Sequence, residues 1–264
     1  MDTDAYLRRF GVDPSSVGDP DLDTLRHLHR KHVRTVPFEN LAITGDPRGR
    51  FEAEGVDLEL PALYGKIVER GRGGYCFELN GLFCWLLAEL GYDARRVAAR
   101  VLAEDGDPGI PANHHSIVVE LDEPYVVDVG LGTPKLRRPI PIRADEPASG
   151  PVCDWLVRPS DRPEEDYCLR MRHPDDGWTG RYVFTEAARS LRYFSAANDY
   201  LQAAEDSPFT GDPYLSIATA DGYVSCSGRA LTTVAGGERT EQTLSEIAWY
   251  DHLDRTFGLP ATDQ

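Results

Sequence analysis

The stretch RGGYCFELNGLFCWLLAELGY, residues 72–92, contains the helix on which the predicted fold depends. Apolar side chains recur along it at helical intervals, at Leu79, Leu82, Phe83, Leu86, Leu87 and Leu90. Gly91 follows directly and suits the left-handed end of a helix. The pattern therefore predicts a buried helix over residues 77–90, with Cys76 at its start.

Cys76 stands where a thiol could react rather than only fill space. Two glycines precede it, so that an incoming group could approach the backbone closely. The free N–H groups and the dipole of a helix N-terminus favour negative charge, and we expect them to lower the pKa of the Cys76 thiol. Most cysteines in apolar stretches are core residues, and we interpret Cys84, Cys153, Cys168 and Cys226 in this way.

A base and a carboxylate for this thiol lie downstream, in PANHHSIVVELDEPYVVDVGLG, residues 111–132. A short Asp-Glu-Pro connection joins two strand-like runs and predicts an antiparallel hairpin. A histidine at the start of the first strand, His114 or His115, should then lie beside Asp128 at the end of the second. Cysteine, histidine and aspartate together form a nucleophile-activating triad. Taken alone, Asp128 could equally cap the Gly-Leu-Gly turn, which lacks the third glycine of a dinucleotide site.

The chain divides into three sections that differ in predicted secondary structure. Residues 1–92 are predicted to be mainly helical, residues 93–193 to form a small barrel or sandwich of short strands, and residues 194–264 to mix both. The expected helices cover residues 23–32, 58–70, 77–90 and 240–256, and the expected strands cover 96–102, 116–121, 124–128, 214–219 and 222–226. No internal repeat or low-complexity linker separates the sections, so we expect them to pack as one body.

The composition disfavours several classes of protein. With 44 acidic and 28 basic residues among 264, the formal net charge is −16, which argues against a nucleic-acid partner. No apolar run approaches the roughly 20 residues of a membrane span, and the first residues lack the apolar core of a secretory signal. The odd count of five cysteines indicates free thiols in a reducing, cytoplasmic environment. We expect no metal ion.

The basic residues are almost all arginine, since lysine occurs only at Lys31, Lys66 and Lys135. An acidic, lysine-poor surface is typical of proteins from salt-loving archaea, because it stays hydrated while salt screens its self-repulsion. We favour this halophilic interpretation over that of an ordinary acidic bacterial protein.

Several stretches together resemble the signatures of the arylamine N-acetyltransferase family. They are VPFENLAI at residues 36–43, RGGYCFELN at 72–80, PANH and YVVDVGLG at 111–114 and 125–132, and DSPFT with GYVSCSGRALT at 206–210 and 222–232. The resemblance implies an α+β fold with a cysteine-protease-like catalytic core. It places a helical domain with the nucleophilic cysteine at residues 1–92, a β-barrel with the histidine and aspartate at 93–193, and an α/β lid at 194–264.

The resemblance also implies a reaction. Acetyl-CoA, as co-substrate, would acetylate Cys76, and an arylamine or arylhydrazine would then attack the thioester in a ping-pong mechanism. Pro111-Ala-Asn-His114 resembles the proline-x-threonine-histidine step of the family, so we favour His114 over His115 as the base. Asp128 would fix the imidazole tautomer, and the Cys76 backbone N–H would stabilise the oxyanion.

The substrate pocket of the family has matching positions in this chain. Phe38, Val101 and Phe209 correspond to pocket residues, and ordinary core packing is the alternative interpretation for them. Leu131 replaces the phenylalanine of the Asp-Val-Gly-Phe-Gly turn in the family, so ring stacking on the substrate should be weaker.

Charged residues near the motifs suggest two further roles. Glu39 and Arg72 lie in the two most specific motifs and are expected to form an ion pair that braces the site. Lys135, Arg137 and Arg138 form the one dense basic cluster of this acidic chain. This cluster is a candidate for binding the phosphates of CoA, and a solvated strand end is the alternative.

Other functions remain compatible with the same residues. A cysteine hydrolase or amidase could use this triad to transfer the acyl group to water. An amide synthase of the same family could use it to close an amide within its substrate. A non-catalytic binding protein would be expected to have lost a triad member, and Cys76, His114 and Asp128 are all present.

Overall fold

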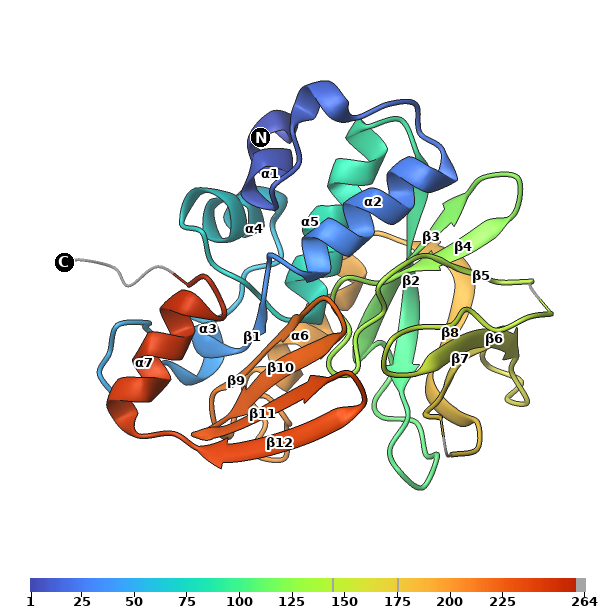
Figure 1. Cartoon of the computed structure of the whole chain (residues 1–264). Helices are drawn as coiled ribbons and strands as arrows, with labels where there is room; N and C mark the ends of the chain where they lie inside the picture. The colour runs from blue at the N-terminus through green and yellow to red at the C-terminus, as the bar shows by residue number, and fades with distance from the viewer. Residues whose placement is uncertain (144, 175, 260–264) are drawn as a thin grey trace.

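The computed structural model describes residues 1–143, 145–174 and 176–259 of the chain. Helices come first, followed by a curled sheet and then by a second sheet with a helix against it (Figure 1). The first part consists of α1 (Thr3–Arg9), η1 (Pro14–Ser16), α2 (Leu22–Val33), α3 (Leu41–Thr44), α4 (Leu60–Tyr64), the π-helical turn η2 (Gly65–Glu69) and α5 (Cys76–Glu89). The helices expected around residues 23–32, 58–70 and 77–90 are confirmed, the second as α4 continued by η2. No helix among the described residues has the length and apolar character that crossing a bilayer requires.

The central part is a seven-stranded antiparallel sheet in the order β5-β4-β3-β2-β8-β7-β6. Its strands are β2 (Asp93–Val101), β3 (His114–Glu120), β4 (Pro124–Val127), β5 (Ile140–Pro141), β6 (Asp154–Pro159), β7 (Tyr167–Arg172) and β8 (Thr179–Arg189). The edge strands β5 and β6 contact each other, so the sheet curls into the predicted barrel, with an apolar interior that includes Trp155, Tyr182 and Phe184.

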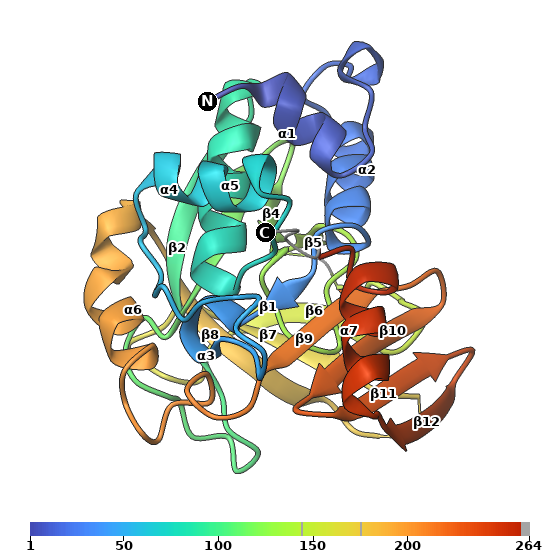
Figure 2. The same ribbon diagram turned by 90° about the vertical axis from the view of Figure 1, so that its left-hand side faces the viewer.

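The last part is a five-stranded antiparallel sheet in the order β1-β9-β10-β11-β12. Its members are β1 (Phe38–Glu39), β9 (Tyr214–Ala218), β10 (Gly222–Ser227), β11 (Ala230–Ala235) and β12 (Glu238–Thr243), and η3 (Leu191–Phe194) with α6 (Ser195–Leu201) leads into it. Helix α7 (Glu246–Arg255) lies across one face of this sheet (Figure 2). Strand β1 comes from the helical first part, so the chain returns to an early segment to complete the sheet. The domain boundaries stay a prediction.

The prediction of a helix over residues 240–256 is wrong in its first part. Residues 238–243 form the edge strand β12, and α7 begins only at Glu246, after the N-cap Ser245. Gly236 and Gly237 both have positive φ and form the tight turn between β11 and β12. All β12 residues are exposed, so no alternation of apolar and polar residues marks this strand in the sequence.

Helix α5 lies at the centre of the largest apolar cluster and is buried along most of its length. The cluster also contains residues of α1 and α2 and, from the barrel, Ile117, Val119 and Val127. The barrel wall is thereby packed against α5, and the start of this helix is brought to the ends of β3 and β4.

Candidate active site

Helix α5 begins at Cys76, so the thiol lies in the first helical turn, as predicted. The Tyr75 backbone N–H at the N-cap donates to Glu78 Oε2 at 3.0 Å, which fixes the start of the helix. The backbone N–H groups of Cys76 and Phe77 interact with the sulfur and favour its ionised form. The Cys76 side chain is buried.

The expectation of a lowered thiol pKa is wrong. Burial, reinforced by the negative charge of Asp128, raises the pKa of Cys76 well above its ordinary value, and the two N–H groups offset this only in part. The thiol therefore keeps its proton until a base removes it, and the site depends on a neighbouring imidazole.

The glycines before Cys76 have a different role from the one expected. A Cβ at Gly73 would lie 2.2 Å from the Pro37 carbonyl oxygen, and a Cβ at Gly74 would lie 2.8 Å from Glu78 Oε2. The Glu39 N–H donates to the Gly74 carbonyl at 3.0 Å. The glycines thus let this loop pack closely on the segment around β1 and on Glu78, rather than clear a path for a ligand.

The predicted hairpin of β3 and β4 is confirmed, with Ile117 opposite Val127. This register places His114 beside Asp128, and His114 Nε2 donates to Asp128 Oδ2 at 2.7 Å, with both side chains buried. Nδ1 of the His114 ring remains for the thiol of Cys76, which lines the same pocket.

Asn80 is a site residue that the sequence analysis did not single out. Its Nδ2 donates to Asp128 Oδ1 at 2.8 Å and to the His115 carbonyl at 2.7 Å. Its Oδ1 accepts from the backbone N–H groups of the two residues after Asp128. Asn80 lies one helical turn after Cys76, and this spacing on α5 was the available signal. A single buried side chain therefore fixes the aspartate turn against the helix of the nucleophile.

Asp128 is held in its ionised form. Burial alone would raise its pKa, but the charge and hydrogen bond of His114, with further hydrogen bonds from Asn80 and Gly130, hold the pKa of Asp128 below its ordinary value. His29 Nε2, from α2, donates to the Asp128 backbone carbonyl at 3.0 Å. The carboxylate is thus positioned by α2, α5 and the barrel together.

The His115 side chain lies in an apolar environment instead. Its ring centroid is 6.0 Å from that of Phe77 and 4.7 Å from that of Phe194. Neither ring nitrogen has a hydrogen-bond partner among the described residues, and burial holds the pKa of His115 well below its ordinary value. This environment is that of a core residue, so the geometry favours His114 as the base.

A pocket of about 280 Å³ adjoins Cys76 and His114. Its wall includes the predicted substrate-binding residues Phe38, Val101, Leu131 and Phe209. The sequence analysis missed the other contributors, among them Asn113, Gly130, Thr133, Arg181, Pro208 and Tyr214.

Gly130 explains how close the aspartate turn comes to the nucleophile. A Cβ at this position would lie 2.8 Å from both the Cα and the carbonyl oxygen of Cys76. Any side chain here would therefore push the turn away from the thiol.

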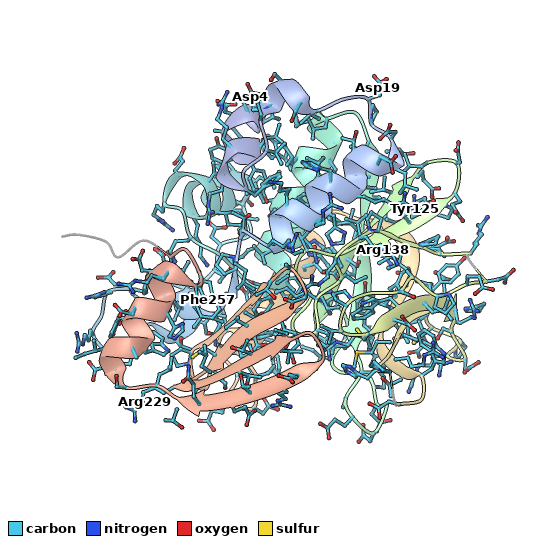
Figure 3. All side chains as sticks on the ribbon, viewed as in Figure 1. Asp4, Asp19, Tyr125, Arg138, Arg229 and Phe257 are labelled. Atoms are coloured by element: carbon cyan, nitrogen blue, oxygen red, sulfur yellow. The ribbon has the colours of Figure 1, made fainter. Side chains whose placement is uncertain are left out.

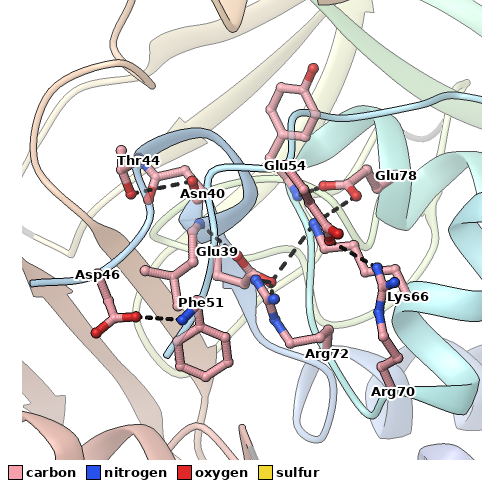
Figure 4. A network of polar contacts seen from close by, with 12 residues as sticks. Glu39, Asn40, Thr44, Asp46, Phe51, Glu54, Lys66, Arg70, Arg72 and Glu78 are labelled. Atoms are coloured by element: carbon pink, nitrogen blue, oxygen red, sulfur yellow. Dashed lines mark hydrogen bonds and ion pairs between the residues drawn. The ribbon is translucent and has the colours of Figure 1, made fainter. Parts of the chain in front are cut away.

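The expected ion pair of Glu39 and Arg72 is confirmed and belongs to a larger buried network (Figure 4). Arg72 Nη2 and Nε donate to Glu39 Oε1 at 2.9 and 3.2 Å. Lys66 Nζ lies 2.7 Å from Glu78 Oε1 and 3.8 Å from Glu39 Oε1. Because Glu78 also caps α5, the network ties the loop before Cys76 to the start of its helix.

Loss of the Arg72 guanidinium is expected to destabilise the protein. Arg72→Met should lower the free energy of unfolding by about 3 kcal/mol, because it leaves the buried Glu39 carboxylate with only the more distant Lys66 as a counter-charge. Urea unfolding followed by circular dichroism measures this change.

Arg70→Met is the matched control. Arg70 forms an exposed ion pair with Glu54 close to the same network (Figure 4), and its removal should change the unfolding free energy by less than about 1 kcal/mol. Equal effects of the two substitutions would contradict a bracing role for the buried pair.

The predicted CoA-binding residues lie around a second cleft. Lys135, Arg137 and Arg138 line it together with Arg30 and Arg34, and Arg138 is labelled in Figure 3. Arg137 donates to the carbonyls of Thr219, Ala220 and Gly222 in the β9–β10 turn, and Arg138 donates to that of Ser149.

Lys135 differs from its neighbours because its side chain is buried. Its Nζ donates to the Leu131 carbonyl at 3.1 Å and lies 5.2 Å from the centroid of the Phe38 ring. Burial lowers the pKa of Lys135 to about 7, and the charge of Asp128 opposes this shift. Lys135 therefore belongs to the wall between the cleft and the Cys76 pocket.

This geometry defines a class of enzyme, the acyltransferases and related hydrolases that carry an acyl group on a cysteine served by histidine and aspartate. Comparison with known proteins narrows the class. An N-acetyltransferase family model matches residues 21–264. The arylamine N-acetyltransferase of Mycobacterium tuberculosis is 36% identical to this chain, over 100% of this chain and 91% of the relative. The chain therefore belongs to the arylamine N-acetyltransferase family and is an acyltransferase.

Solved structures of relatives share the fold. An arylamine N-acetyltransferase of Bacillus cereus, described as having a Cys-His-Glu catalytic triad, superposes with a TM-score of 0.87 at 25% identity, over 98% of this chain and 99% of that one. The Mycobacterium marinum arylamine N-acetyltransferase in complex with CoA has a TM-score of 0.84 at 29% identity, over 98% and 93%. The third position of the candidate triad in the present chain is an aspartate, Asp128.

Proposed function

We propose that this chain transfers an acetyl group from acetyl-CoA to the nitrogen of an arylamine or arylhydrazine, through a thioester on Cys76. The observation that carries the proposal is the hydrogen-bonded pair of His114 and Asp128 on the same apolar pocket as the Cys76 thiol. Membership of the family and the CoA complex of the M. marinum relative support acetyl-CoA as the donor.

The first half-reaction acetylates the enzyme. His114 Nδ1 accepts the thiol proton, the sulfur attacks the carbonyl carbon of acetyl-CoA, and the bond from that carbon to the CoA sulfur breaks. Asp128 accepts a hydrogen bond from the Nε2–H of His114 and stabilises the imidazolium, which then protonates the departing CoA thiolate. Because burial raises the pKa of the Cys76 thiol, we expect the imidazole to take up the thiol proton before or as the sulfur attacks.

The second half-reaction regenerates the thiol. The aryl nitrogen attacks the thioester carbonyl, His114 accepts a proton from the amine, and the carbon–sulfur bond to Cys76 breaks. The sulfur recovers its proton from His114. In both halves the backbone N–H of Cys76, at the N-terminus of α5, is the proposed donor to the tetrahedral oxyanion.

We further propose that the basic cleft binds the phosphates of CoA. The chain has a formal net charge of −16, but this cleft is lined by several arginines. The cleft is therefore a place on an acidic protein where an anion can bind. The segment from Gly130 to Arg138 borders both the Cys76 pocket and the cleft, which is consistent with one ligand extending between them. Arg34, Arg137 and Arg138 would contact phosphate, while the buried Lys135 would act through the shared wall.

Removal of two cleft charges tests the phosphate site. The double variant Arg34→Gln, Arg138→Gln is expected to raise KM for acetyl-CoA about 10-fold or more, because each arginine would form a charge-assisted hydrogen bond to phosphate. Steady-state kinetics of CoA release measures the effect. S-acetylpantetheine, which lacks the nucleotide phosphates, is the control donor and should be used equally well by both proteins. An unchanged KM for acetyl-CoA would contradict this placement.

The reaction itself is tested with acetyl-CoA and 4-methoxyaniline, by measuring free CoA and the N-acetylated product. With acetyl-CoA alone, we expect one equivalent of CoA per chain and then a halt, since the thioester awaits an amine. Continuous CoA release without amine would identify a hydrolase that transfers the acyl group to water. Turnover without any acyl-enzyme would exclude the ping-pong route.

A further inference from the structure

Arg181 is a cation on the wall of the Cys76 pocket that the proposed reaction does not use. It lies near the start of β8, where the Leu102 N–H donates to its backbone carbonyl at 3.1 Å and holds it beside the end of β2. Its Nη2 donates to the Thr133 carbonyl at 3.2 Å. A Cβ added at Gly132 would lie 3.7 Å from this Nη2 atom. The guanidinium is thus fixed against the turn that follows Asp128.

The hydrogen-bonding capacity of Arg181 is only partly used. Its Nε is shielded from solvent and has no hydrogen-bond partner among the described residues. No carboxylate in the described part of the chain forms an ion pair with it. Asp128, which is near enough to favour its charge, is already bonded to His114 and Asn80. A largely shielded guanidinium without a carboxylate partner is costly for the protein, and an anion that reached its Nη atoms from the pocket would compensate its charge.

Several other polar groups of the pocket have partners or reactive roles. Asn113 Oδ1 accepts from the Val101 N–H at 2.9 Å, and the hydroxyls of Thr133 and Tyr214 are 3.0 Å apart. Cys76 and His114 are the reacting pair. Arg181 is the cationic side chain among the described residues of this wall, and it is therefore the group best suited to an anionic substituent of the substrate.

The remaining walls indicate what kind of substrate carries that substituent. The side chains of Phe38, Leu131, Phe209 and Tyr214 enclose an apolar space suited to an aromatic ring. At about 280 Å³ the pocket lies just below the typical range of ligand sites, about 300–1,000 Å³. A single ring with a small substituent fits this size.

We propose that Arg181 binds a carboxylate on the acceptor, and that the enzyme prefers monocyclic arylamines with a ring carboxylate over neutral ones. This inference rests on the proposed function. The planar guanidinium matches a carboxylate with two parallel hydrogen bonds, and the apolar side chains around it would strengthen the pairing. The amine of the same ring then faces the Cys76 thioester. Arg181 is a specificity-determining residue in this assignment and takes no part in bond making.

The test compares 4-aminobenzoate with 4-aminobenzamide, which has the same shape without the charge. Arg181→Met is expected to lower the ratio of their kcat/KM values about 10- to 100-fold, with little change for the amide. Arg181→Gln is the second variant, because it keeps a polar but uncharged side chain on the wall, and it should lower the ratio by a similar factor. Arg192→Met removes an exposed arginine from η3 and should leave the ratio unchanged.

The acylation half-reaction shows whether the anion that Arg181 binds belongs to the acceptor, to the phosphates of CoA or to the acyl group. Single-turnover acetylation of Cys76 by acetyl-CoA should be unaffected by Arg181→Gln, and its loss would assign Arg181 to the phosphates of CoA instead. A selective loss of acylation by malonyl-CoA, with the acceptor ratio intact, would assign it to the acyl group. Either result overturns the proposal, as does an equal loss for both acceptors, which would make Arg181 only a support for the turn. If the wild-type protein acetylates neither amine, the proposed function fails as well. If it acetylates both and the ratio of their kcat/KM values is the same in the Arg181 variants, only this inference fails.

Discussion

Cys76→Ala is expected to abolish acetyl transfer, with kcat falling by about 10⁴-fold or more, because Cys76 is the one thiol among the described residues that line this pocket. Intact-protein mass spectrometry with acetyl-CoA alone should show one acetyl adduct on the wild-type chain and none on the variant. Peptide mapping should place that adduct on Cys76. Cys76→Ser should be nearly as inactive, since a serine hydroxyl is far less easily ionised than a thiol.

Cys84→Ser is the matched control, because Cys84 lies on the same helix but is buried in the core away from the pocket. It should keep most of the transfer activity and the acetyl adduct. Persistent turnover in Cys76→Ala, or loss of the adduct in Cys84→Ser alone, would overturn the assignment of the nucleophile.

His114→Ala is expected to lower kcat/KM by about 10²- to 10⁴-fold, the range for loss of a general base. The structure adds a second, independent consequence. Since burial raises the pKa of Cys76, the thiol without its imidazole partner should also react slowly with iodoacetamide at neutral pH. Alkylation rates of wild type and variant, measured by mass spectrometry without any substrate, check this.

His115→Ala is the control for the adjacent position. The His115 ring is buried against Phe77 and Phe194, so its removal should lower stability while Cys76 alkylation stays near the wild-type rate. Slow alkylation in His115→Ala together with normal alkylation in His114→Ala would show that the base is His115.

Local sequence patterns were enough to predict the order of the parts and the approach of a histidine to Asp128. The apolar spacing of α5 and the short connection between β3 and β4 each act over neighbouring residues, so helix and hairpin could be inferred directly. Since the hairpin register fixes which residues face each other, it also placed a histidine beside Asp128. The exposed edge strand β12 had no such pattern and was assigned to a helix.

The surroundings of the site depended on contacts between distant segments. Arg181 reaches the Cys76 pocket only because β8 pairs with β2, and no local motif marks it. Lys135 stands in a run of basic residues that suggested a site for the phosphates of CoA, yet its side chain is buried and turns inward onto Phe38. The thiol pKa was mispredicted for a similar reason, because helix position can be read from sequence but the depth of burial cannot.

Strand β1 connects the C-terminal sheet to the loop before Cys76. Phe38 pairs with Ser216 of the C-terminal sheet and forms a bridge with Gly74, just before the nucleophile, while its ring lines the substrate pocket. The neighbouring Asn40 donates to the carbonyls of Phe209 and Asp212 and accepts from the Tyr214 N–H. The C-terminal sheet is thus hydrogen-bonded to the segment that also contacts the loop before Cys76, and a hinged opening of this sheet would break those bonds. We therefore expect donor and acceptor to reach the sulfur through movements of side chains and loop tips at the mouth of the pocket, which makes the size and charge of that mouth a selector of substrates.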